Sequence, residues 1–151
     1  MDVLLIGARL WLWAGMLRGL KQVVPIATLV RMTRATPRRQ TAADVQRRVE
    51  TYLGRKGRFP FRPPSNCLER SLGVYRLLCR SGADPELVVG VRRSPGRGVK
   101  GHVWVTVDGR VLGETLEEVA GFVPIVIFDS RGRQTPSAST SNLQLPTSKL
   151  F

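Results

Sequence analysis

Cysteine and histidine can together form a nucleophile and its base, and this chain contains few of either. Its 151 residues include two cysteines, Cys67 and Cys79, and one histidine, His102. The thiolate is the attacking form of cysteine, and a neighbouring imidazole can take the proton from the thiol. Any Cys–His mechanism in this chain must therefore use His102, and the choice lies between the two cysteines.

The residues around Cys67 predict that it occupies the first position of a helix. Asn66 is a favourable N-cap residue, and Glu69 stands three residues later, which makes a variant of the capping box. Apolar residues at helical spacing continue to about Ser81, and Gly82 can supply the left-handed residue that ends the helix. The N–H groups of a helix N-terminus lower the pKa of a thiol and can donate to a developing oxyanion. We therefore predict that Cys67 is the nucleophile; the alternative is a small buried core residue.

Cys79 fits that alternative better, because it continues the apolar side of the same helix seven residues after Leu72. At a rise of about 1.5 Å per residue the two cysteines lie roughly 18 Å apart, too far for a disulfide. Free thiols fit a reducing cytoplasm. Met1-Asp2 lacks the basic start of a signal peptide, so we expect a cytoplasmic protein.

A strand and a hairpin follow His102. Residues 102–107 alternate, with the odd-numbered valines on one face and His102 on the other. Asp108-Gly109 then predicts a turn, which either a two-residue or a three-residue loop could form. The loop length decides which residue of the returning strand lies opposite His102.

The hairpin register predicts the third member of the site. A two-residue loop would pair Val103 with Glu114 and place a carboxylate on the apolar face. A three-residue loop would pair Val103 with Gly113 and set His102 directly opposite Glu114. We expect the three-residue loop, with Glu114 as the acid that orients His102 and Asp108 as a turn residue.

The elements that position these residues predict an α+β fold, with helices first and an antiparallel sheet after them. Helices are expected at residues 3–20, 23–32, 41–53 and 67–81, and strands at 87–91, 102–107, 110–114 and 122–128. The length fits one domain with an ordinary core. We expect N-terminal helices and a linker over 1–39, the catalytic domain over 40–129, and a disordered Ser/Thr-rich tail over 130–151.

Several of these runs resemble a known family. They are NCLERSL at 66–72, VYRLL at 74–78, LVVGV at 87–91, GHVWV at 101–105 and DGRVL at 108–112. Together they are similar to the stand-alone leader peptidases of lasso-peptide biosynthesis, which belong to the transglutaminase-like branch of the papain-type fold. The resemblance covers roughly residues 40–129, and the apolar, arginine-containing N-terminus is also like the family's.

The resemblance implies a cysteine peptidase that removes the leader from a ribosomally made precursor. Cys67 and His102 match the family's nucleophile and base, and Glu114 stands where the family usually has aspartate. That difference leaves Asp108 as a substitute for the third position. The resemblance also implies that a separate protein recognises the leader and that a cyclase acts on the freed core.

Charge and composition bear on the remaining classes of function. The formal net charge of +13 would attract polyanions, acidic peptides or anionic membrane. A nucleic-acid binding module is disfavoured, because the arginines are scattered and not interleaved with stacking aromatics. No metal or cofactor is expected, since one histidine and two distant cysteines cannot supply a zinc site, and Gly96-Arg97-Gly98 lacks the ending of a phosphate loop. An inactive scaffold of the same fold is the other alternative.

The first predicted helix is nearly all apolar, but Arg9 and Arg18 interrupt it, which makes it a poor membrane span. The two arginines lie nine residues apart and so fall on opposite sides of the helix, leaving no clean amphipathic stripe. Three alternatives stay open for residues 3–20: burial against the domain, contact with a membrane surface, and, least favoured, a true membrane span.

Overall fold

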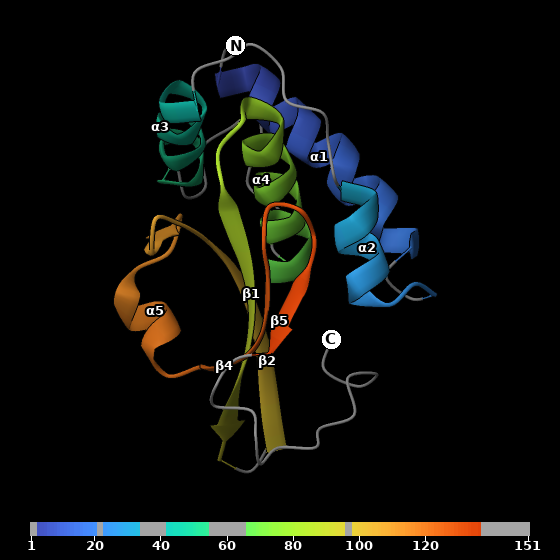
Figure 1. Cartoon of the computed structure of the whole chain (residues 1–151), viewed down its shortest axis with the longest axis vertical. Helices are drawn as coiled ribbons and strands as arrows, with labels where there is room; N and C mark the ends of the chain where they lie inside the picture. Colours follow the sequence, from blue (N-terminus) through green and yellow to red (C-terminus); the bar gives the residue numbers. More distant parts are fainter. Residues whose placement is uncertain (1–2, 21–22, 34–41, 55–65, 96–97, 137–151) are drawn as a thin grey trace.

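The fold begins with four helices, which a computed structural model places around one core. The structure describes residues 3–20, 23–33, 42–54, 66–95 and 98–136. The helices are α1 (Val3–Leu20), α2 (Ile26–Thr33), α3 (Ala42–Gly54) and α4 (Cys67–Ser81). The first three each contact α4, which therefore forms the centre of the helical layer (Figure 1). None of the helices in the described ranges is long and apolar enough to cross a membrane.

A five-stranded antiparallel sheet follows, in the order β3-β2-β1-β4-β5. Its strands are β1 (Pro85–Ser94), β2 (Gly98–Val107), β3 (Arg110–Leu112), β4 (Val123–Phe128) and β5 (Gln134–Pro136), and α5 (Leu116–Ala120) lies between β3 and β4. This architecture confirms the predicted α+β fold, with the helices first. The predicted linker at 34–39 and the turn-rich approach to Cys67 at 57–64 lie outside the described residues.

Two elements were missed from the sequence. The pattern Thr115-x-x-Glu118 forms a reciprocal capping box that begins α5, a signal that was present but unused. β5 pairs with β4 through Ile127 and Thr135, so the prediction of a disordered tail from Ser130 is wrong at this strand. Its composition is poor in apolar residues, and the pairing depends on backbone hydrogen bonds to an available sheet edge. The rest of the predicted tail lies outside the described residues.

The predicted three-residue hairpin loop is also wrong. Asp108 and Gly109 form a two-residue loop with φ values of 50° and 74°, and Val105 pairs with Leu112. Asp-Gly favours this turn because both central positions need positive φ. The expected penalty, a carboxylate on the apolar face, does not arise, because β3 ends at Leu112 before Glu114 can pair.

The sheet is covered on both faces. Val103, Val105 and Val107 of β2 pack with α4 and the N-terminal helices in the main core. A second cluster on the other face contains Val88, Trp104, Val119 and Phe122, with Val119 contributed by α5. Because side chains alternate along a strand, His102 lies on the face of Trp104, whereas α4 covers the face of Val103. Residues of α4 and His102 can therefore meet only around the edge of β2.

Candidate active site

Cys67 occupies the first position of α4, as the sequence predicts. The side chain of Asn66 caps the helix by accepting hydrogen bonds from the N–H groups of Leu68 and Glu69, at 2.9 and 3.3 Å. Of the first amides of α4, the cap thus takes Leu68 and Glu69, and the N–H of Cys67 is the one that it leaves for a substrate oxyanion. The sequence predicts that several N–H groups at this helix end could donate to an oxyanion. In the structure only the N–H of Cys67 is left for that role by the cap.

Glu69 does not act as the sequence suggests. The capping-box variant predicts a side chain that folds back to the N-cap, but Glu69 is only 2% exposed and its carboxylate lies 3.4 Å from the guanidinium of Arg18 in α1. This ion pair joins the last turn of α1 to the first turn of α4, which also carries Cys67. Removing Arg18 would take an ion-pair partner from a buried acid, which is destabilising.

His102 and Glu114 are in contact. Nε2 of His102 lies 2.6 Å from one carboxylate oxygen of Glu114, and the guanidinium of Arg70 pairs with the other oxygen. The Glu114 side chain is only 7% exposed, so both interactions act in a partly desolvated place. Because Nε2 is engaged by Glu114, the ring nitrogen that remains for the thiol of Cys67 is Nδ1.

Gly113 explains how Glu114 reaches His102 despite the different hairpin register. Its φ is 75°, a left-handed conformation in which the chain turns out of the ladder just before Glu114. A Cβ atom at Gly113 would also collide with the side chain of Leu53 from α3. The right contact was therefore predicted for the wrong reason: a glycine turn, and not cross-strand pairing, delivers the carboxylate.

The early end of β3 also exposes the backbone of β2 to α4. The last pairs of the hairpin join Val105 with Leu112, so Val103 lies beyond the paired part of that edge. Ser71 of α4 donates a hydrogen bond of 2.8 Å to the carbonyl of Val103, and the backbone of Val103 also hydrogen-bonds Cys67. These two contacts fix the first turns of α4 against the strand that carries His102.

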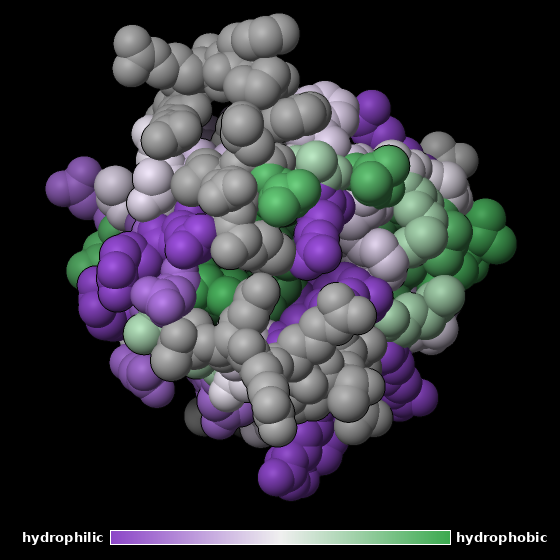
Figure 2. All heavy atoms as spheres, turned by 90° about the horizontal axis from the view of Figure 1, so that it is seen from above, coloured by the Kyte–Doolittle hydropathy of each residue, from purple (hydrophilic) through white to green (hydrophobic). Residues whose placement is uncertain are grey.

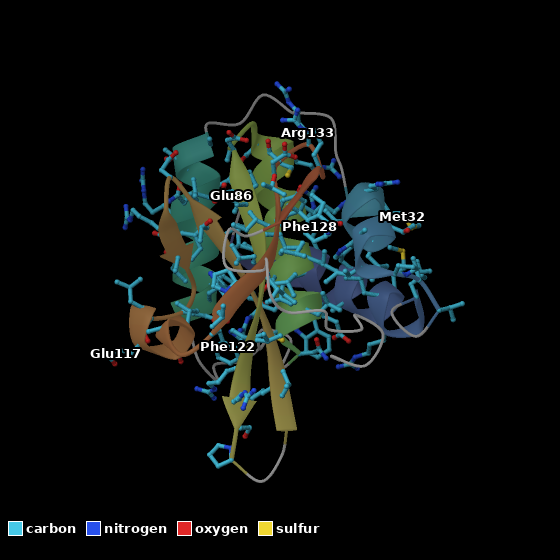
Figure 3. All side chains as sticks on the ribbon, turned by 60° about the horizontal axis from the view of Figure 1, so that its bottom comes forward. Met32, Glu86, Glu117, Phe122, Phe128 and Arg133 are labelled. Carbon is cyan, nitrogen blue, oxygen red and sulfur yellow. The ribbon has the colours of Figure 1, made fainter. Side chains whose placement is uncertain are left out.

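Two aromatic rings flank the imidazole. The His102 ring lies 4.9 Å from that of Phe122 and 5.9 Å from that of Trp104, which stacks at an interplanar angle of 23°. Figure 3 shows Phe122 beside α5, next to the start of β4. Gly90, the partner of His102 in β1, provides room for this packing, because a Cβ atom there would meet the Trp104 indole at 2.7 Å. The rings hold the imidazole in one orientation and shield it from water.

These contacts shift both pKa values in the direction that favours an ion pair. Burial alone would raise the pKa of Cys67, but hydrogen bonds from His102 and the Val103 backbone, with the charges of His102 and Arg70, outweigh it and lower the pKa. Hydrogen bonds to Cys67 and then to Glu114 raise the pKa of His102 to about 9, against the effect of burial. Both shifts act in the direction that favours a thiolate beside an imidazolium.

The structure thus brings Cys67, His102 and Glu114 together and separates the other candidates from them. Asp108 is exposed in the hairpin turn, and Cys79 is buried in the core. Arg70 was missed as a site residue, although it stands three residues after Cys67 and so lies on the same side of the helix. The described parts of the chain contain no group of three or more His, Cys, Asp and Glu side chains that could hold a metal.

The fold and the site define an α+β protein in which a cysteine at a helix N-terminus meets a histidine and a carboxylate from an antiparallel sheet. A family model described as the transglutaminase-like superfamily matches residues 10–127, and the chain belongs to this superfamily. Catalysis in the superfamily is generally cysteine-based. No curated protein and no solved structure matched the chain.

Proposed function

We propose that this protein is a cysteine peptidase with Cys67 as nucleophile, His102 as general base and acid, and Glu114 as the residue that orients His102. The observation that carries the proposal is the contact between His102 and Glu114 at 2.6 Å beside a cysteine whose pKa is lowered by the same histidine. A core cysteine would not need a helix cap, a charged partner and an oriented imidazole together. Superfamily membership supports cysteine chemistry on this fold.

The proposed reaction proceeds in two halves. The thiolate of Cys67 forms a C–S bond to the carbonyl carbon, and the Cys67 N–H donates to the oxygen that gains charge. The C–N bond breaks as the His102 imidazolium gives its proton to the leaving amine, which leaves a thioester. His102 then accepts a proton from water, whose oxygen attacks the thioester. The thiolate leaves, and the products are a carboxylate and an amine.

We propose further that the amide lies between the leader and the core of a lasso-peptide precursor. This substrate rests on the sequence resemblance at residues 66–72 and 101–112. A separate leader-recognition protein would present the precursor, and a cyclase would use the new core N-terminus. The net charge of +13 is compatible with an acidic peptide or partner surface.

The test uses the precursor peptide encoded beside the gene, with and without the neighbouring recognition protein, and mass spectrometry of the products. Wild-type protein should release leader and core, and Cys67→Ala and His102→Ala should each abolish cleavage while circular dichroism stays unchanged. Cys79→Ala is the control, because that thiol is buried in the core. Full cleavage by Cys67→Ala would refute the mechanism. Cleavage of unrelated peptides with equal efficiency would refute the proposed substrate, and absence of any thiol-dependent activity would favour an inactive scaffold.

A further inference from the structure

The first helix is apolar on both of its sides. Its inner side includes Ile6, Leu10 and Leu17, each at most 2% exposed in the main core. Its outer side exposes Leu5, Trp11, Leu12 and Met16, by 51, 40, 78 and 44% respectively. These four side chains are here called the outer face of α1. In Figure 2 apolar side chains gather on the side of the molecule where Figure 1 places α1 and α2. An exposed apolar cluster of this kind on a small domain indicates a surface that binds a membrane or another protein.

A cationic groove borders the outer face of α1. It is a hollow of about 310 Å³ between α1 and α4, to which Arg9 contributes from α1 and Arg76 and Arg80 from α4. Leu12 and Met16 belong both to its lining and to the outer face. The described lining contains no acidic residue, and α1 itself has none. We call this hollow the arginine groove.

Arg76 and Arg80 of the groove lie close enough to repel one another. Burial, and then the charge of Arg80, lower the pKa of Arg76, whose guanidinium lies 4.5 Å from the centre of the Trp13 ring. Arg76 also donates to the carbonyl of Met32 at the end of α2. Figure 3 shows Met32 on the outer side of the molecule, opposite Glu117 of α5. A phosphate group in the groove would offset this repulsion between like charges.

We propose that the outer face of α1 and the arginine groove together bind the surface of an anionic lipid bilayer. The apolar side chains would enter the boundary between head groups and acyl chains, and the three guanidinium groups would contact lipid phosphates. Leucine, methionine and tryptophan beside arginine are the residue types that interfacial helices use. The exposed side chains stand on the convex outside of a helix, which suits a flat bilayer better than a peptide lying in the groove.

The inner packing of α1 fixes the orientation of this face. Leu10 lies against Gly73 of α4 so closely that a Cβ atom at Gly73 would collide with it. Arg18 pairs with the buried Glu69, which anchors the last turn of α1. The helix therefore cannot roll to bury its outer side, and the outer face stays presented to the surroundings.

The proposal is independent of the proposed peptidase activity. Arg76 and Arg80 follow Cys67 by nine and thirteen residues on α4, roughly 14 and 20 Å along the helix axis. A bilayer bound at the groove would thus leave the nucleophile at the other end of the helix. Membrane binding can be measured with Cys67→Ala, so a failure of one proposal does not imply a failure of the other.

The experiment is flotation of the full chain with two kinds of vesicles, one of phosphatidylcholine alone and one of phosphatidylcholine with phosphatidylglycerol. We expect binding to the mixed vesicles, weaker binding as salt is raised, and a blue shift of tryptophan emission that Trp11→Phe diminishes. Equal binding to both kinds of vesicles, or binding to neither, would overturn the proposal. Binding to an acidic amphipathic peptide without binding to mixed vesicles would overturn it as well.

Matched variants assign the binding to this surface. Leu12→Asp should weaken vesicle binding about tenfold, because one leucine no longer enters the bilayer. Leu116→Asp on α5 is the control, since Leu116 is 72% exposed against 78% for Leu12. The double variant of Arg76→Gln and Arg80→Gln should lose about tenfold or more, whereas the charge-matched Arg110→Gln with Arg131→Gln should change little. Equal losses in test and control variants would show general charge or hydrophobicity, and would refute the assigned surface.

Discussion

Replacing Glu114 with glutamine should lower the pKa of His102 and move the alkaline limit of activity toward neutral pH. Both oxygens of the Glu114 carboxylate are engaged, one by His102 at 2.6 Å and the other by Arg70. Glutamine has one acceptor oxygen and no charge, so the two donors would compete for it. His102 would lose the counter-charge that favours its protonated form.

The size of the effect follows from the pKa of His102. That pKa is raised from 6.5 to about 9 by Cys67 and then Glu114. At about 1.4 kcal/mol per pH unit, and allowing for solvent screening, the two partners favour the charged ring by about 2–3 kcal/mol. Because Glu114 supplies only part of this, we expect a pKa of about 7–8 in Glu114→Gln. Activity should also fall, by about 10²–10⁴-fold, because the ring loses its orientation.

The sign of the pH dependence is fixed by which forms react. Activity needs the thiolate of Cys67 and the protonated His102, so it should rise through the lowered pKa of Cys67 and fall through about pH 9 in the wild type. In Glu114→Gln the falling limb should move to lower pH. Below the pKa of Cys67 the thiol is protonated in both proteins, and both should be inactive.

Nuclear magnetic resonance can measure this pKa directly, because His102 is the only histidine of the chain. One imidazole signal should titrate near pH 9 in the wild type and about one to two units lower in Glu114→Gln. Asp108→Asn is the control: Asp108 has a φ of 50° in an exposed turn, which asparagine tolerates. A wild-type midpoint near 6.5 would refute the reasoning, as would an equal shift in Asp108→Asn.

Three further predictions concern the residues around the triad. Arg70→Gln should raise the pKa of Cys67, since the Arg70 charge lowers it, and should slow alkylation by iodoacetamide at neutral pH; Arg110→Gln should leave alkylation unchanged. Gly113→Ala should lower the free energy of unfolding, measured in urea, by about 1–2 kcal/mol because φ is positive and by about 1–3 kcal/mol more because the new Cβ overlaps Leu53. Gly109→Ala also has a positive φ but open space around it, so it should show only the first of these two losses. Asn66→Ala and Thr115→Ala each remove an N-cap, so each should lower the free energy of unfolding by about 1 kcal/mol. Only Asn66→Ala should also slow alkylation of the Cys67 thiol. Equal thiol reactivity in the two variants would contradict the assigned role of the Asn66 cap.

The parts of the fold that local patterns determine were predictable. Asn66 and Gly82 bound α4 at its two ends as expected, because capping depends on residue types adjacent in sequence. The alternation after His102 likewise predicted β2, although the strand begins earlier, at Gly98. The superfamily match confirms the transglutaminase-like assignment, and the leader-peptidase role stays a prediction.

The parts that depend on tertiary packing were not predictable from the same patterns. Side-chain pairing at Val103 favours a three-residue hairpin loop, but the turn preference of Asp108-Gly109 and the short β3 determine the register. The position of Glu69 predicts a local cap, yet its carboxylate forms an ion pair with Arg18, which lies fifty-one positions earlier in the chain. Interactions of this range leave no mark in local spacing, and only the folded chain shows them.

The contact of α1 with α4 has a consequence for how this protein can be divided. A fragment beginning near residue 40 would correspond to the expected catalytic domain, but it would lack Leu10 against Gly73 and Arg18 against Glu69. Glu69 would then carry a carboxylate two residues from Cys67 with its ion-pair partner removed, and the apolar side of α4 would meet water. The N-terminal helix α1 therefore supports the helix that carries Cys67. Truncation or replacement of the N-terminal helices should therefore reduce solubility and thiol reactivity together.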